Sequence, residues 1–98
     1  MPQLQRLALD NNALGESGGV AVGEALKSGK VPQLQRLVLD DNALGDGAAA
    51  ALAAAISANA LPNLAQLELE GDNNVSDAGR KALDDAKEAA GSEVEITF

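Results

Sequence analysis

The stretch that decides the fold is PQLQRLVLDDNALG, residues 32–45, because residues 2–15 read PQLQRLALDNNALG. The two stretches are identical at 12 of 14 positions. A looser third copy begins at Pro62, so that Pro2, Pro32 and Pro62 are evenly spaced. A fixed period of this length is typical of a solenoid, in which each repeat is one supersecondary unit. We therefore predict a single domain with repeats at residues 1–31, 32–61 and 62–98.

Every repeat carries the same apolar frame, L-x-x-L-x-L-x-x-N-x-L, followed by a helix-like stretch. The L-x-L alternation turns two side chains to one face of a short strand. The asparagine falls where the chain leaves that strand, and its amide can bond backbone groups left unpaired in the turn. The third repeat has one extra residue in this turn. The asparagines at this position are Asn12, Asn42 and Asn73.

This pattern resembles the leucine-rich repeat, and the resemblance covers essentially the whole chain. A unit of this length with a full helix is similar to the ribonuclease-inhibitor-like subfamily. The resemblance implies an α/β solenoid with parallel strands on a concave face and helices on a convex face. It also implies that Asn12, Asn42 and Asn73 form a ladder from one coil of the solenoid to the next.

The second half of each repeat is predicted to be helical. Gly15, Gly45 and Ser76 stand at the expected N-caps, and each is followed by an acidic residue that suits a helix N-terminus. The first helix contains three interior glycines, each costing about 0.5–1 kcal/mol relative to alanine, so we expect it to be the weakest. The third is polar, as the last unit of a solenoid requires.

The tail SEVEITF alternates apolar and polar residues, which is a strand pattern. We expect a terminal strand at about residues 93–98, with Val94 and Ile96 in the places of the inward leucines. The predicted inventory is therefore four parallel strands and three helices.

Composition excludes several classes of function. The chain has no cysteine and no histidine, so disulfides, thiolate or imidazole metal sites and the usual catalytic bases are absent. We predict no enzyme activity and no cofactor. The net charge of −8 would repel a phosphate backbone, so nucleic-acid binding is not expected. No segment resembles a membrane span or a signal peptide, which predicts a cytoplasmic protein if the chain is natural.

Stacking the strands in register predicts charged rows on the concave face. Asp10, Asp40 and Glu70 would form an acidic row beside a shorter basic one. This surface could bind a partner protein or, weakly, a hard cation with oxygen ligands. Alternatively, duplication copied solvated residues whose charges neutralise locally. The concave protein-binding candidates are Arg6, Asp10, Arg36, Val38, Asp40, Gln66, Glu68 and Glu70.

The start of the chain shows no capping unit, so the inner leucines of the first repeat lack a neighbour on one side. An exposed leucine forgoes about 1.5–3 kcal/mol of burial, and unpaired strand edges invite association. The chain is therefore either a piece of a longer horseshoe or a protein that pairs with another copy. The self-association candidates are Leu4, Leu7, Leu9 and Leu14.

Three functions follow from these observations. The near-identity of the first two repeats favours an engineered or consensus-like scaffold without catalytic activity that self-associates through its first repeat. The alternatives are a natural module that binds another protein on its concave face and a weak acidic cation-binding surface. A partner is seldom periodic, so the repeated concave charges favour the scaffold.

Overall fold

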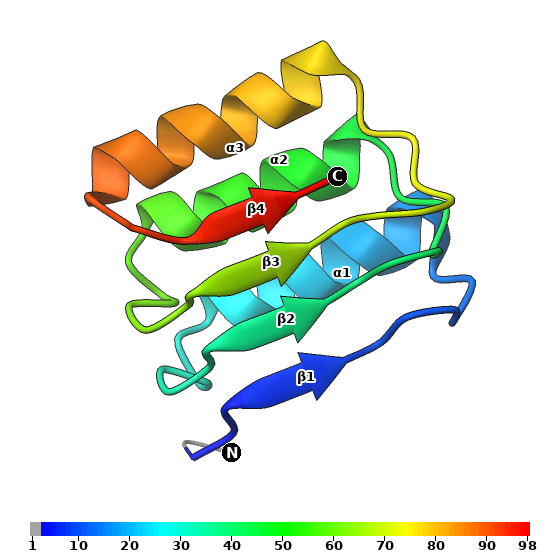
Figure 1. Cartoon of the computed structure of the whole chain (residues 1–98). Helices are drawn as coiled ribbons and strands as arrows, with labels where there is room; N and C mark the ends of the chain where they lie inside the picture. Colours follow the sequence, from blue (N-terminus) through cyan, green and yellow to red (C-terminus); the bar gives the residue numbers. More distant parts are fainter. Residues whose placement is uncertain (1–2) are drawn as a thin grey trace.

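The computed structural model describes residues 3–98, in which four strands alternate with three helices (Figure 1). The elements are β1 (Arg6–Ala8), α1 (Gly15–Lys27), β2 (Arg36–Val38), α2 (Asp46–Ser57), β3 (Gln66–Glu68), α3 (Asp77–Ala90) and β4 (Glu95–Thr97). We call β1 with α1 the first coil, β2 with α2 the second, and β3 with α3 the third. This architecture confirms the predicted fold class, a short α/β solenoid of the leucine-rich-repeat type.

The strands form one parallel sheet in the order β1-β2-β3-β4, and the helices form a second layer on one side of it (Figure 1). Because the repeats have a constant length up to the end of each strand, equivalent positions stack: Leu7 lies opposite Leu37, and Leu37 opposite Leu67. The parallel register carries each side-chain column across the sheet, so the leucines between the two layers form a continuous core.

The core is centred on the second coil. Leu37, Leu39 and Leu44 are completely buried, as are Leu67 from β3 and Leu83 from α3. The second helix is almost entirely alanine, leucine and isoleucine because it has a neighbouring helix on each side, α1 and α3. A helix that is apolar around most of its circumference is a buried helix.

The predicted terminal strand is present as β4 and pairs with β3, Ile96 lying opposite Leu67. Val94 is completely buried. The third helix ends at Gly91, whose φ of 62° is the left-handed conformation that closes many helices. The guanidinium of Arg80 lies 4.6 Å from the centre of the Phe98 ring, so a cation–π contact covers part of this end.

The N-cap predictions hold for Gly45 and Ser76 but are wrong for Gly15. The first helix already includes Gly15, and Leu14 precedes it in a helical conformation. The Gly45 amide donates a hydrogen bond to the Glu16 carboxylate of the preceding coil at 3.2 Å. Within residues 3–98 no earlier coil offers such a carboxylate to α1, and its first turn takes a different form.

The interior glycines of α1 have a packing role in addition to their cost in helix propensity. A Cβ built on Gly19 would lie 2.6 Å from the Cβ of Ala48, and one on Gly23 would lie 2.6 Å from the Cβ of Ala51. These separations are too short for real side chains, so the two glycines permit the close approach of α1 to α2. None of the helices in the described residues is long and apolar enough to cross a membrane.

Candidate interaction surfaces

The concave face carries a charge gradient from β1 to β4. The register places Arg6, Arg36, Gln66 and Glu95 in one row across the sheet. Two residues further along each strand, a second row runs through Ala8, Val38, Glu68 and Thr97. The basic end of the sheet therefore belongs to the first two coils and the acidic end to the last.

The centre of this face is held by an ion pair between neighbouring strands. Nε of Arg36 lies 2.7 Å from Oε2 of Glu68, and this pair joins β2 to β3. The hydrogen bond from Arg36 to Glu68 and the carboxylate charge raise the pKa of the guanidinium above its usual value. The charges of Arg36 and Glu68 are thus partly neutralised within the chain itself.

Val38, a predicted contact residue of the concave face, offers little area. Its exposed fraction is 7%, because it lies in its row between Ala8 and Glu68, beside the Arg36–Glu68 pair. A partner on this face would meet mainly the charged side chains around Val38.

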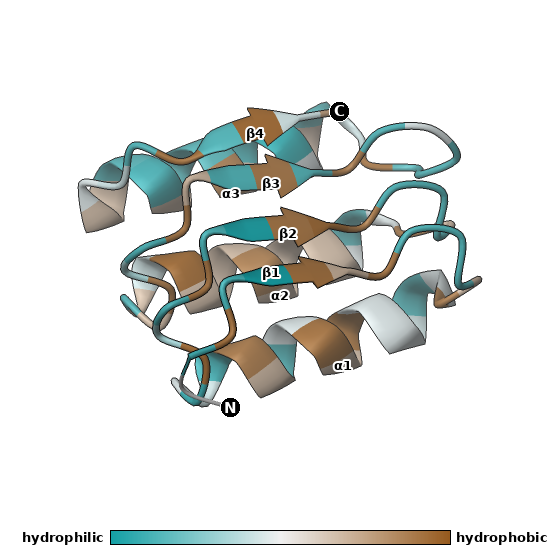
Figure 2. Cartoon of the chain, turned by 60° about the horizontal axis from the view of Figure 1, so that its bottom comes forward, coloured by the Kyte–Doolittle hydropathy of each residue, from teal (hydrophilic) through white to brown (hydrophobic). Residues whose placement is uncertain are grey.

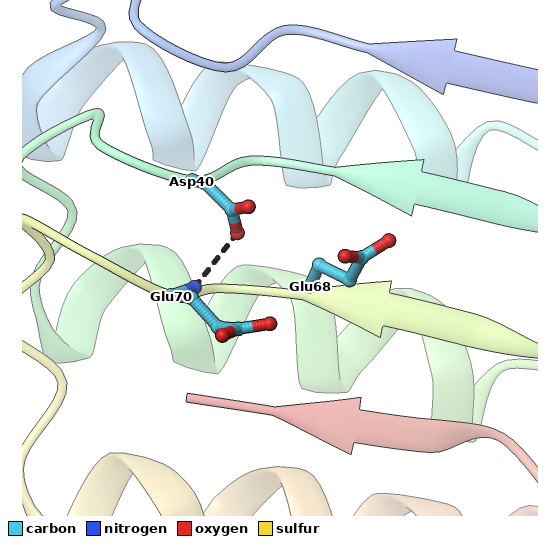
Figure 3. A group of neighbouring side chains, drawn as sticks. All are labelled: Asp40, Glu68 and Glu70. Atoms are coloured by element: carbon cyan, nitrogen blue, oxygen red, sulfur yellow. Dashed lines mark hydrogen bonds between the residues drawn. The ribbon is translucent and has the colours of Figure 1, made fainter.

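The acidic residues gather differently from the predicted column of Asp10, Asp40 and Glu70. One carboxylate oxygen from each of Asp40, Glu68 and Glu70 lies within 4.8 Å of the others (Figure 3). The structure thus brings in Glu68, and this group does not include Asp10.

Each carboxylate of this acidic cluster already has a partner in the chain. Asp40 accepts a hydrogen bond from the Glu70 amide at 2.8 Å (Figure 3), and Glu70 accepts one from the Thr97 hydroxyl at 3.2 Å. Glu68 pairs with Arg36. The hollow beside them measures about 160 Å³, below the roughly 300–1,000 Å³ of small-molecule sites. These bonds account for the cluster without a bound ion.

The asparagines tie neighbouring coils together. The side-chain oxygen of Asn42 accepts a hydrogen bond from the Asn12 amide at 2.8 Å, and its Nδ2 donates to the Leu9 carbonyl at 2.7 Å. Asn73 repeats the arrangement on the second coil, accepting from the Asn42 and Leu44 amides. Asn42 is completely buried, whereas Asn12 is exposed and its Nδ2 donates to the Asp10 carbonyl. The two complete links are therefore those made by the second and third asparagines.

Carboxylates form a second link between coils that the sequence did not reveal. Glu16 of α1 accepts hydrogen bonds from backbone amides at the start of α2, the shortest from Ala48 at 2.6 Å. Asp46 of α2 likewise accepts from the Ser76 amide at 2.7 Å and from the Ser76 hydroxyl. These bonds lower the pKa of Asp46. The signal in the sequence is an acidic residue at the same place in each repeat, which by itself indicates only a favourable charge at the N-terminus of its own helix.

We define the N-terminal face as Leu4, Leu7, Leu9 and Leu14 together with the open edge of β1 and the outer side of α1. These four leucines are only partly buried, whereas their counterparts in the second coil, Leu34, Leu37, Leu39 and Leu44, are each 0% exposed. In Figure 2 α1 is coloured mainly brown and white, while α3 at the opposite end of the stack is largely teal. The two ends of the solenoid therefore differ in hydropathy.

One family model, described as Leucine Rich repeat, matches residues 32–53, which span β2 and the first part of α2. A search of curated proteins finds no match. The matched segment lies in the second coil, which has a neighbouring coil on each side. Leucine-rich-repeat domains are generally protein-binding scaffolds and are typically non-catalytic.

Proposed function

We propose that this chain is a consensus-like leucine-rich-repeat scaffold without catalytic activity that binds protein through its N-terminal face, the partner being a second copy of itself. The observation that carries the proposal is the contrast between matched leucines. Leu7 and Leu37 occupy equivalent positions in nearly identical sequences, yet only Leu37 is completely buried.

Association would bury apolar surface that the N-terminal face leaves exposed. Complete burial of one leucine is worth about 1.5–3 kcal/mol, and four leucines on this face are only partly buried. Within the described residues no strand pairs with the outer edge of β1. Unpaired edges with adjacent apolar surface are the usual sites of association between chains.

The consensus-like character rests on the repetition itself. The first two repeats are identical at 12 of 14 positions over the strand and turn, including most of the exposed charges of their concave face. A surface selected for one partner would be expected to vary between repeats. Recent duplication or engineering accounts for this repetition.

A concentration series tests the proposal. Sedimentation velocity of the full chain from micromolar to millimolar concentration should show a reversible shift from monomer to a larger species. Leu7→Asp should weaken this shift beyond its effect on folding, whereas Leu37→Asp should weaken it only in proportion to lost helical structure. A strictly monomeric species at high concentration would overturn the proposal.

The acidic end of the concave face supports a second candidate, the binding of a basic protein segment. Glu68, Glu70 and Glu95 line the same shallow hollow. Residues 62–98 contain nine acidic and three basic residues, a net charge of −6. A lysine-rich peptide should then bind with an affinity that falls as salt rises, and Glu70→Gln should weaken it. Binding unchanged by salt and by Glu70→Gln would exclude this candidate.

A cation site is less supported, because the clustered carboxylates already have partners.

A further inference from the structure

We infer that two copies of this chain join through antiparallel pairing of their β1 strands about a two-fold axis at Ala8, which makes one continuous eight-stranded sheet. The inference rests on the proposed function, in which the N-terminal face binds a second copy. It adds the orientation of the partner, the register of the pairing and the closed, dimeric size of the assembly.

The backbone of β1 shows which groups remain for a partner strand. The Leu9 amide donates to the Val38 carbonyl at 2.8 Å, and the Arg36 amide donates to the Gln5 carbonyl at 3.0 Å. Odd-numbered residues of this segment therefore bond to β2. Because successive residues of a strand direct their backbone groups to opposite sides, those of Arg6 and Ala8 point to the open edge. Asp10 lies in the turn after β1, where its carbonyl accepts a hydrogen bond from Asn12.

The side chains of β1 and of the turn after it favour one register of the pairing. With the two-fold axis at Ala8, Arg6 lies opposite Asp10 of the second copy, and symmetry makes this contact twice. Both residues are exposed, so the pairing needs no rearrangement of the coil. The same register places Leu7 opposite Leu9 of the second copy on the inner face. A register centred on Leu7 would instead set Arg6 against Ala8 and lose the charge pair.

The outer side of α1 fits the same arrangement. Ala48 and Ala51 are the α2 residues that approach α1, at Gly19 and Gly23. Their counterparts on α1, one repeat earlier in the sequence, are Gly18 and Ala21, so these small residues lie on the side of α1 away from α2. A two-fold axis perpendicular to the sheet would bring two α1 helices together antiparallel along this side. Small residues there allow close packing of the helix layer alongside the paired strands.

The opposite end of the solenoid is a poorer partner for this face. The third helix exposes charged side chains along its length, namely Arg80, Lys81, Asp84, Asp85 and Glu88. Packing α1 of a second copy on α3 would remove charges from water against small and apolar residues, which is costly. Head-to-tail contacts would also generate an open filament, whereas the two-fold contact closes at a dimer.

Disulfide trapping tests the orientation, because the chain itself contains no cysteine. Directly opposed residues of a hydrogen-bonded antiparallel pair have Cα atoms about 5.5 Å apart, within the roughly 4.4–6.8 Å that a disulfide spans. Ala8→Cys alone should therefore form a covalent dimer under mild oxidation. Thr97→Cys is the matched control, because it lies in the same row at the opposite edge of the sheet and should form no covalent dimer.

The outcomes separate this inference from the proposed function. If the chain associates but a disulfide forms only when Ala8→Cys and Thr97→Cys are mixed, contacts are head-to-tail and the inference is wrong while self-association stands. If the unmodified chain is monomeric and neither variant is trapped, both fail. If association is present and neither variant nor their mixture is trapped, the inference is wrong.

Charge exchange tests the register independently. Arg6→Glu should weaken dimerisation about tenfold, since it turns two attractive cross-strand pairs into repulsive ones. The combined change Arg6→Asp with Asp10→Arg should restore the affinity, and both variants should keep the helical circular dichroism of the unmodified chain. Equal weakening by the single and the combined change would contradict the register.

Discussion

The strand and turn segments of the first and second coils have nearly the same sequence and yet different structural roles. Leu37 is completely enclosed, whereas Leu7, with the same neighbours in sequence, is only partly buried. Asn42 is buried and bonds the coil before it, whereas Asn12 is exposed. The position of a coil in the stack therefore decides how much a repeated residue contributes to stability, because the coils on both sides bury its side chain.

The largest expected effect is on the matched leucines. Leu37→Ala should lower the free energy of unfolding by about 3–5 kcal/mol, as for a fully buried leucine that leaves a cavity. Leu7→Ala should cost about 1–2 kcal/mol at protein concentrations where the chain is monomeric, because part of its side chain is already exposed. Urea denaturation of both variants measures this difference. Equal losses would mean that the two coils are enclosed alike.

The asparagines should show the next largest contrast. Asn42→Ala removes the acceptor of the Asn12 amide and the donor to the Leu9 carbonyl, so we expect a loss of about 2–3 kcal/mol. Asn12→Ala should cost less than about 1 kcal/mol, because its side chain is exposed. Thermal unfolding followed by circular dichroism separates the two variants, and a reversed order would contradict the ladder as described.

Replacing a glycine of α1 by alanine tests whether helix propensity or packing against α2 has the larger effect on stability. Helix propensity alone would make Gly23→Ala stabilising by about 0.5–1 kcal/mol. The contact with Ala51 instead makes it overpacked, and we expect a net loss of about 1–3 kcal/mol. Ser17→Ala, at an exposed position of the same helix, is the control and should be nearly neutral. A stabilising Gly23→Ala would show that α1 packs more loosely against α2.

The smallest expected effect is the pH dependence of the carboxylate link. Because the folded pKa of Asp46 is lowered by its bonds to Ser76, this link stabilises the fold above the ordinary carboxyl pKa. The stabilisation is lost as the pH falls through the lowered value, below about pH 4. Asp46→Asn should therefore be less stable than the unmodified chain at neutral pH, with the difference shrinking in acid. Ser76→Ala should reduce the same pH dependence, and a constant difference at all pH values would contradict the link.

Much of the fold was predictable because the repeat fixes which leucines face inward and which residues share a row. The strand register and the core around Leu37 follow from that periodicity, and the fourth strand follows from the alternation of apolar and polar residues in the tail. The capping of one helix by a carboxylate of the preceding coil was not predictable, because Glu16 and Ala48 are 32 residues apart and meet only through the offset between coils. The burial of Val38 depends similarly on neighbouring strands.

The most direct test of self-association through the N-terminal face is amide hydrogen exchange of matched residues at increasing protein concentration. The amides of Arg6 and Ala8 should exchange quickly in dilute solution and slow markedly as the second copy binds, while that of Leu37 stays protected throughout. If the chain associates and the exchange of Arg6 and Ala8 does not change, the N-terminal edge is not the interface and the account is contradicted.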